Sequence, residues 1–493
     1  DGSMQIEVDA KGTLIDTIDV IEPIPGDTVV LTIGSKLQKV AEEALKRTID
    51  EVRNKKPYPQ TFSGAVVAID VNTGEILAMA SEPKFDPNLF ASGISSKDWA
   101  SLQPTTDDRY APKPLINNAI SYPLPPGSTF KMITAVAGLT ENKISSKESI
   151  ICRGRYTGVP GVSPSDSGGA VHGGTNLHKA IKVSCNNYFF ETGRRLGGEL
   201  FEKYAEMFGF GQYTGIELPY ESKGMVEGPK HKKKLYEGYI DSYLTYTVKL
   251  QNEEAKEKIK AMIYESPAQN QTTYNFYREL RNRIRELGVT EDSHIERIIW
   301  YISESRYRPG DVLNAAIGQG LNNVTPLQLA SYVATIANGG IRYKPYIVSK
   351  VISYDGTVKL EKKPEVVEKL NVDPKDLAAI REGMFAVTNE VGGTARYYFL
   401  GSKVSVAGKT GTAEAGKYRP DPINKPKYYE NYNDHSWFVA FAPYEKPEIA
   451  VAAVVFQGGY GSGAAPIARA IIEEYLASED VNDYIVPYDE LQP

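Results

Sequence analysis

Ser128 and Lys131 form the first pattern in the sequence that could do chemistry. They lie three positions apart, where a Pro-Pro-Gly run gives way to an apolar segment of helical period from Ser128 to Leu139. Residues with this spacing share one face of a helix, so the Lys amine can accept the Ser proton and activate a weak nucleophile. The positive potential of a helix N-terminus favours both the neutral amine and the alkoxide. An ordinary capped helix could carry the same two residues, so this pattern alone is not decisive.

Two further patterns follow Ser128 in the chain. One is a Ser-Cys-Asn run, and the other is a Lys-Thr-Gly-Thr run that an alternating strand pattern introduces. Their members are Ser184, Asn186, Lys409, Thr410, Gly411 and Thr412. In sequence and order, the three patterns match the S-x-x-K, S-x-N and K-T-G motifs of the penicillin-interactive serine enzymes. The chain therefore resembles class B penicillin-binding proteins, of the penicillin-binding protein 2 kind.

The sequence around these motifs extends the resemblance. Residues 316–320 (Ala-Ile-Gly-Gln-Gly), 324–330 and 435–443 also resemble that family, and the likeness runs from about residue 27 to 480. It implies an α/β fold, the penicillin-binding transpeptidase or serine β-lactamase-like fold. In that fold a five-stranded antiparallel sheet is flanked by helices, an all-helical subdomain packs against one side, and the cleft lies between them. We expect the Gln319-Gly320 segment to serve helix packing rather than chemistry.

The resemblance also assigns catalytic roles. Ser128 attacks the penultimate D-alanine carbonyl of a peptidoglycan stem peptide, and an amino group of a second stem captures the acyl-enzyme. Lys131 is the base, and Ser184 relays a proton toward the leaving amine. Asn186 hydrogen-bonds either the substrate carbonyl or Lys131.

The K-T-G strand is expected to bind the substrate's terminal carboxylate through Lys409, Thr410 and Thr412. The backbone N–H groups of Ser128 and Thr412 form the oxyanion hole. β-Lactams, which mimic the substrate dipeptide, react at the same site. Two alternatives share all three motifs: a D,D-carboxypeptidase and a non-catalytic β-lactam sensor. A β-lactamase is disfavoured because the sequence shows no residue identifiable as a deacylating base.

Both cysteines of the chain lie in one ligand-rich stretch. If the Ser-Cys-Asn run is extended, Cys185 points away from the cleft and toward Cys152. With Asp166 and His172, the two thiols make a four-ligand set that suits a structural zinc ion, and His178 is the alternative to His172. Buried free thiols and a disulfide are the competing interpretations. The chemistry itself requires no cofactor.

Composition sets the broader limits. The chain has 56 basic and 62 acidic residues. It therefore lacks the excess of positive charge with which proteins bind nucleic acid. No apolar run reaches the length that a membrane span needs. The resemblance implies an N-terminal membrane anchor upstream of this chain, a place at the extracytoplasmic face of the membrane, and partnership with a SEDS-type glycan polymerase.

The chain divides into four parts. Residues 1–26 are interpreted as the tail of an N-terminal pedestal, residues 27–480 as the transpeptidase domain, and residues 481–493 as a C-terminal tail. A Tyr-, Lys- and Glu-rich stretch of helical period, residues 229–305, is interpreted as an insertion. Within the domain, strands are predicted at 65–69, 75–80, 403–407, 436–441 and 448–456, and a last helix at 465–477. His231 and His294 are expected at the solvated surface, and His435 in the cleft wall.

Overall fold

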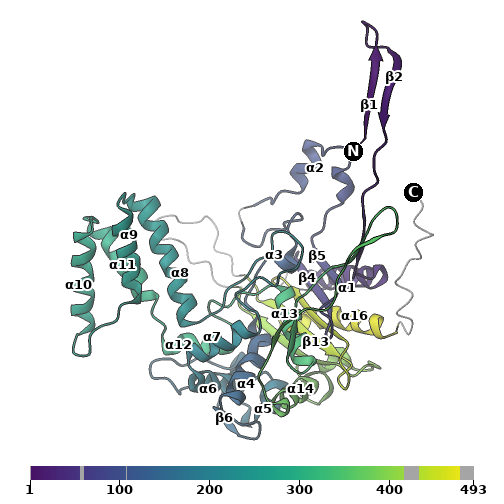
Figure 1. The fold of residues 1–493 in the computed structure, drawn as a ribbon. Coiled ribbons are helices and arrows are strands. Elements are labelled where there is room, and N and C mark those ends of the chain that lie inside the picture. Colours follow the sequence, from purple (N-terminus) through teal and green to yellow (C-terminus); the bar gives the residue numbers. More distant parts are fainter. Residues whose placement is uncertain (1, 56–59, 107, 416–431, 478–493) are drawn as a thin grey trace.

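The computed structural model describes residues 2–55, 60–106, 108–415 and 432–477, and its centre is the expected five-stranded antiparallel sheet (Figure 1). The strands pair in the order β12-β13-β14-β4-β5. Their bounds are β4 (Gly64–Asp70), β5 (Ile76–Glu82), β12 (Ala407–Ala413), β13 (His435–Ala442) and β14 (Ile449–Val455). The sequence thus brings strands from both ends of the chain together.

The composition of each strand explains its place in the sheet. β13 and β14 are almost continuously apolar because they are buried on both faces. β4 and β5 form a hairpin whose turn contains Gly74 with φ +83°, a conformation that glycine adopts without strain. The predicted strand at 403–407 is wrong in its bounds, since β12 begins only at Ala407. Ser405 precedes β12 and instead binds the backbone of Tyr444, beyond the end of β13.

Helices cover both faces of the sheet (Figure 1). α1 (Ser35–Arg53) and α16 (Ala465–Ala477) pack together on one face, and α16 has the predicted bounds. α13 (Pro326–Ala337) packs against β14, β4 and β13, α14 (Pro374–Asn389) packs against β12, and α4 (Lys131–Thr140) packs against α14. α1 buries Leu37, Ala41, Leu45 and Ile49 at helical spacing, so its apolar face is the one that meets the sheet.

A mainly helical subdomain, rather than the predicted all-helical one, surrounds α4. It consists of α5 (Leu177–Lys182), α6 (Asn186–Leu196), α7 (Gly198–Met207) and α12 (Pro309–Ala316), with a small ladder of β6 (Ile150–Cys152) and β7 (Gly173–Thr175) at its edge. Residues 131–139 of α4 are all buried. α4 is therefore the central helix of the subdomain, and it also contacts α14, which packs against β12 of the sheet.

Residues 229–304 form a separate helical unit, here named the helical appendage. It contains α8 (Pro229–Ser242), a π-helix (Tyr243–Val248), α9 (Glu253–Ala261), α10 (Thr273–Glu286) and α11 (Asp292–Glu304). These helices bury an apolar cluster of their own, including Ile259, Leu280 and Ile298. The appendage extends from one side of the body in Figure 1.

The remaining elements are short. β1 (Ser3–Val8) and β2 (Leu14–Ile21) form a hairpin that projects from the body (Figure 1). Smaller ladders use β3 (Thr28–Leu31), β8 (Ile341–Tyr343), β9 (Val348–Ile352), β10 (Val358–Glu361) and β11 (Val366–Lys369), and the short helices are α2 (Ser96–Ser101), α3 (Asn118–Ser121) and α15 (Arg396–Phe399). The described part of the chain also contains 3-10 turns at Pro87–Phe90, Gly127–Phe130, Ser167–Gly169, Met262–Tyr264 and Gly461–Ala464. Among the described residues no helix is long and apolar enough to cross a bilayer, and the predicted tail at 481–493 lies outside them.

Candidate active site

The three sequence motifs meet in one cleft of about 1020 Å³. Ser128, Ser184, Asn186, Thr410 and Thr412 all line it. The two lysines of the motifs, Lys131 and Lys409, are fully buried at its edge. Residues that are far apart in the sequence are thus brought to one site, as the motifs predict.

Ser128 lies in the 3-10 turn Gly127–Phe130, which runs directly into α4. The predicted helix start at Ser128 is therefore a 3-10 turn, with α-helix from Lys131. Gly127 has φ +54°, and a Cβ there would lie 2.5 Å from the carbonyl oxygen of Thr412. Only glycine lets the turn approach β12 this closely. The turn that contains Ser128 is thereby held beside the strand that carries Thr412.

The ammonium group of Lys131 connects the first two motifs. Its Nζ donates to the carbonyl oxygen of Ser184 at 2.7 Å, to Ser184 Oγ at 3.2 Å and to Asn186 Oδ1 at 2.6 Å. Burial lowers the pKa of Lys131 to about 8. A lysine with such a pKa is partly neutral near physiological pH and can act as a base. Of the two predicted partners of Asn186, the structure shows Lys131.

Lys409 approaches Ser184 from the opposite side. Its Nζ donates to Ser184 Oγ at 2.8 Å and to the carbonyl oxygen of Thr410 at 3.0 Å. Burial, and then the charge of Lys131, holds the pKa of Lys409 well below its usual value. Ser184 therefore lies between two buried amines and can pass a proton between them.

The hydroxyls of the K-T-G strand face the cleft. Thr412 Oγ1 accepts a hydrogen bond from the backbone N–H of Gly461 at 2.9 Å, which leaves its own proton free to point elsewhere. Thr410 Oγ1 shares a hydrogen bond of 2.8 Å with Thr394 Oγ1. Thr394 also lines the cleft, although the sequence analysis missed it because it belongs to none of the three motifs.

The Ser-Cys-Asn run is not extended, contrary to the expectation. Ser184 has φ +58°, in the left-handed region, and Asn186 is the first residue of α6. Cys185 caps that helix with an extended backbone and is fully buried. The expected outcome nevertheless holds, since Ser184 and Asn186 line the cleft while the Cys185 side chain lies in the protein body.

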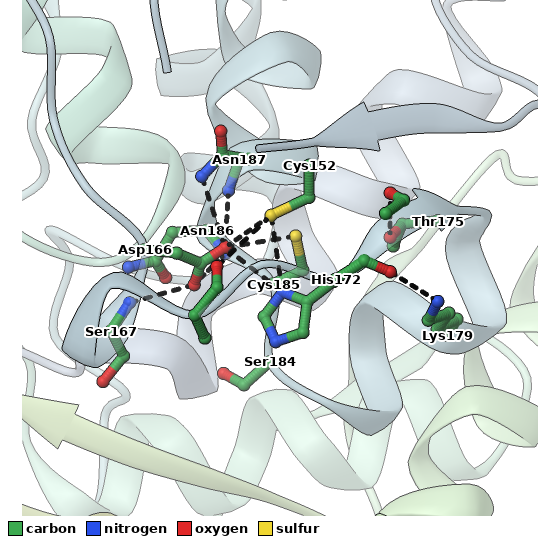
Figure 2. Close-up of polar contacts among 12 residues, drawn as sticks. Cys152, Asp166, Ser167, His172, Thr175, Lys179, Ser184, Cys185, Asn186 and Asn187 are labelled. Carbon is green, nitrogen blue, oxygen red and sulfur yellow. Dashed lines mark hydrogen bonds and ion pairs between the residues drawn. The ribbon is translucent and has the colours of Figure 1, made fainter. Parts of the chain in front are cut away.

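Cys152, Asp166, His172 and Cys185 point toward one another close to Ser184 (Figure 2). Asp166 Oδ2 lies 3.4 Å from Cys152 Sγ, 3.3 Å from Cys185 Sγ and 3.4 Å from His172 Nδ1. All four donor atoms lie within 4.8 Å of one another. Both cysteines are free thiols, and His178 lies instead against Glu390 at 3.0 Å. The set chosen from the sequence, with His172 rather than His178, thus converges.

Asp166 links this cluster to the Ser-Cys-Asn run. Its Oδ1 accepts from the backbone N–H of Asn186 at 3.0 Å, while its Oδ2 faces the thiols and accepts from the Asn187 amide at 3.3 Å. Burial alone would raise the pKa of Asp166, but the Asn186 N–H and the charge of Lys131 bring it below its usual value. The carboxylate therefore stays ionised and ties the start of α6 to the cluster.

Several expectations about single residues need correction. His435 is fully buried on β13 behind Tyr110, so it does not line the cleft, and burial lowers its pKa to about 3. His231 is only 22% exposed and pairs with Glu202, and His294 accepts from or donates to the Tyr243 hydroxyl at 2.8 Å. Gln319 and Gly320 also line the cleft, and their predicted role in helix packing stays a prediction. The sequence around each histidine could not predict these contacts, because the partner residues are distant in the chain.

Comparison with known proteins agrees with the geometry. The family model of the penicillin binding protein transpeptidase domain matches residues 64–473. The chain belongs to this family. Every motif residue named above lies within the matched range. A peptidoglycan D,D-transpeptidase, MrdA, of Acinetobacter baumannii is 29% identical to the chain over 484 residues, which is 98% of the chain and 58% of the relative.

Two solved structures share this fold. One belongs to a peptidoglycan synthase complex that coordinates polymerization and crosslinking, with a TM-score of 0.68 and 26% identity over 97% of this chain and 67% of that one. The other is penicillin-binding protein A of Mycobacterium tuberculosis as a ceftriaxone acyl-enzyme, with a TM-score of 0.60 and 26% identity over 91% of this chain and 80% of that one. The chain spans about three fifths of the length of the curated relatives it matches.

Proposed function

We propose that the chain is the catalytic domain of a peptidoglycan D,D-transpeptidase that works through an acyl-enzyme on Ser128. One observation carries the proposal: Ser184 Oγ lies within hydrogen-bond distance of both Lys131 and Lys409, in the cleft that Ser128 also lines. A serine nucleophile, a base of lowered pKa and a hydroxyl relay are what acyl transfer at a peptide carbonyl needs. The name of the A. baumannii relative supports the same activity.

The first half-reaction forms an ester. Ser128 Oγ attacks the carbonyl carbon of the penultimate D-alanine of a stem peptide, and the hydroxyl proton passes to the neutral Nζ of Lys131. The backbone N–H groups of Ser128 and Thr412 stabilise the oxyanion. When the intermediate collapses, the peptide C–N bond breaks and a proton from Lys131 reaches the departing D-alanine amine through Ser184. Lys131 is then neutral again.

The second half-reaction reverses these proton movements. The amine of a second stem attacks the ester carbon and gives up a proton through Ser184 to Lys131. The bond to Ser128 Oγ breaks as Oγ regains a proton, and a new amide joins the two stems. Lys409, Thr410 and Thr412 bind the terminal carboxylate of the donor stem before acylation. A β-lactam acylates Ser128 in the same way, and its carboxylate occupies the same subsite.

An assay with donor and acceptor tests this activity. A stem pentapeptide ending in D-Ala-D-Ala is incubated with the protein, with and without a diamino-acid acceptor, and products are separated by mass. Cross-linked product that requires both the acceptor and Ser128 supports the proposal. Hydrolysis alone identifies a D,D-carboxypeptidase, and penicillin labelling without any peptide turnover identifies a sensor. Either of these outcomes contradicts transpeptidation.

We further propose that Cys152, Asp166, His172 and Cys185 hold a structural zinc ion. Two thiols, an imidazole nitrogen and a carboxylate are donors that zinc prefers, and a tetrahedral site places its donors about 3.3–3.8 Å apart. The contacts of Asp166 Oδ2 with the other three donors, 3.3–3.4 Å, fit that spacing. When bound, the ion supplies structural crosslinking rather than activation of water. Asp166 would connect the bound ion to the backbone of Asn186, because its Oδ1 accepts a hydrogen bond from the Asn186 N–H.

Elemental analysis of protein purified without chelator tests the zinc site. We expect one zinc per chain, loss of the metal in Cys185→Ser, and a lower Tm in that variant. His178→Ala is the matched control, because this histidine lies nearby but pairs with Glu390. Metal-free wild-type protein, or zinc retained by Cys185→Ser, contradicts the site and leaves buried thiols as the account.

We also infer that the domain works at the extracytoplasmic face of the cell membrane with a SEDS-type glycan polymerase. Peptidoglycan stems are available there, and a solved relative belongs to a complex that couples polymerization with crosslinking. In this scheme residues 1–26 end a pedestal, and residues 229–305 are an insertion in the domain of residues 27–480. Co-purification of the full-length protein with the polymerase tests the partnership, and recovery of the protein alone from mild detergent contradicts it.

A further inference from the structure

Both connections of the helical appendage reach one buried polar cluster in the body. At the start of α8, Glu202 of α7 accepts from the backbone N–H of His231 at 2.8 Å, and Lys232 Nζ pairs with Asp311 Oδ2 of α12 at 2.7 Å. Tyr307, which follows α11, lies against Gly198 of α7. The appendage is therefore joined to two helices of the subdomain, α7 and α12.

Glu227 lies at the centre of this junction. It directly precedes the Gly-Pro that begins α8, and only 3% of its surface is exposed. Its Oε1 and the Tyr307 hydroxyl are buried without a hydrogen-bond partner among the described residues. A buried carboxylate oxygen without a hydrogen-bond partner lowers the stability of the fold. Stability alone therefore does not explain the presence of Glu227.

The other carboxylate oxygen of Glu227 holds a loop of the cleft wall. This cleft loop, residues 317–323, includes Gln319 and Gly320, which line the cleft. Glu227 Oε2 accepts from the backbone N–H of Leu321 at 2.7 Å, and the Glu227 N–H donates to Asn322 Oδ1 at 2.9 Å. Gly320 has φ +76°, and a Cβ there would lie 2.7 Å from Glu227 Oε2. The loop is shaped around the carboxylate.

The cleft loop in turn contacts the nucleophile turn. The carbonyl oxygen of Gly318 accepts from the backbone N–H of Gly127 at 3.0 Å. A Cβ on Gly318 would lie 2.2 Å from the carbonyl oxygen of Gly127, so the two backbones are in direct contact. A continuous chain of contacts therefore runs from Glu227 through Leu321 and Gly318 to the residue before Ser128.

We propose that Glu227 is a positioning residue for acylation, whose ionised carboxylate fixes the cleft loop and, through Gly318, the turn that carries Ser128. The proposal rests on the proposed function, because it assumes that Ser128 is the nucleophile. Because Glu227 directly precedes α8, the segment that joins the helical appendage to the body would then influence the rate of acylation.

The charges around Glu227 make this influence depend on pH. Burial raises the pKa of Glu227 to about 7. The groups that face it are Asp311 of α12, Lys232 of α8 and Glu202 of α7, with the Tyr307 hydroxyl beside them. The one cation among these, Lys232, is already paired with Asp311. Protonation of Glu227 turns a charge-assisted hydrogen bond to Leu321 into a weaker neutral one.

Acylation by a fluorescent penicillin tests the proposal on the whole chain. Glu227→Leu removes the acceptor and is expected to slow acylation about tenfold, as for loss of a hydrogen bond to a charged group. Gly320→Ala, which displaces the carboxylate without removing it, should slow acylation similarly. Glu221→Leu is the matched control: Glu221 also accepts backbone N–H groups, of Thr214 and Gly215, but not from the cleft loop. It should acylate at the wild-type rate.

Glu227→Gln separates positioning from mere packing. It keeps an acceptor but cannot ionise, so the ratio of wild-type to Glu227→Gln rates should rise about threefold as the pH increases from about 6 to about 8. Titration of Lys131 cancels in this ratio. A constant ratio, or a folded Glu227→Leu protein that acylates at the wild-type rate, overturns the inference. Wild-type protein that forms no adduct contradicts the proposed function itself, and the inference with it.

Discussion

Lys131 and Lys409 donate to the same hydroxyl, that of Ser184, at 3.2 Å and 2.8 Å. Both amines are fully buried. Two ammonium groups so close together repel each other, and burial penalises both charges, so the site favours the loss of one proton. The arrangement favours a neutral amine beside Ser184, in the cleft that Ser128 also lines.

The acylation rate should depend on the protonation of Lys131. Its pKa is lowered to about 8, and the neutral amine is the base, so the rate should rise with pH and level off above that value. Well below that pKa, the acylation rate should fall about tenfold for each unit by which the pH decreases. Protonation of Glu227 should add a smaller decrease. The second-order rate constant of acylation by a slowly reacting penicillin, measured at a series of pH values below and above 8, tests this prediction. A rate that falls as the pH rises toward 8 contradicts Lys131 as the base.

Gly127→Ala should nearly abolish acylation. The new Cβ would lie 2.5 Å from the Thr412 carbonyl oxygen, so the turn must move away from β12 and carry Ser128 out of line with the oxyanion hole. Gly356→Ala is the control, because Gly356 has φ +83° but no neighbour within 4 Å of a Cβ. Both changes share the conformational cost of about 1 kcal/mol. Equal acylation by the two variants would show that the close approach is unimportant.

Thr394→Val should weaken recognition of the carboxylate. Thr394 shares a hydrogen bond with Thr410 at 2.8 Å, and loss of this partner lets the Thr410 hydroxyl turn away from the substrate. We expect acylation by a penicillin to slow about fivefold, as for loss of one neutral hydrogen bond, and Thr394→Ser to restore it. A penicillin methyl ester, which lacks the carboxylate, should react equally with wild type and Thr394→Val. Equal slowing with acid and ester contradicts this role.

Removal of the distal part of the helical appendage should leave acylation nearly unchanged. The rings of Tyr236 and Tyr301 lie 6.4 Å apart, so a short Gly–Ser linker can replace residues 237–300. Ile302, buried at present, is changed to Ser to avoid an exposed apolar side chain. Glu227, Lys232 and Asp311 stay in place. If a folded deletion protein no longer reacts with penicillin, the appendage itself is part of the site.

Sequence alone predicted which residues meet in the cleft, because their motifs are short and locally spaced. Ser128 and Lys131 are three positions apart on one turn, and the alternation of β12 places Thr410 and Thr412 on the same face. The five-stranded sheet followed from the family resemblance, and the apolar runs of β13 and β14 agree with it. The motif spacing and the apolar runs are both local patterns, and they can therefore be read from the sequence without knowledge of the tertiary structure.

Other features depend on contacts that no local pattern records. The left-handed backbone of Ser184, with φ +58°, follows from its place between α5 and α6. The choice of His172 over His178 depends on where the loop before β7 folds, and the burial of His435 depends on Tyr110. Glu227 looked like an ordinary acidic residue before a Gly-Pro, because its partner Leu321 is 94 positions away.

Intact mass spectrometry after penicillin treatment tests the central claim most directly. The account predicts one penicilloyl adduct per wild-type chain, located by peptide mapping on Ser128. The adduct should persist for many minutes, because the sequence motifs include no residue identifiable as a deacylating base. The Ser128→Ala variant should show no adduct and an unchanged fold by circular dichroism. A wild-type chain that remains unmodified, or a Ser128→Ala chain that labels equally well, contradicts Ser128 as the nucleophile.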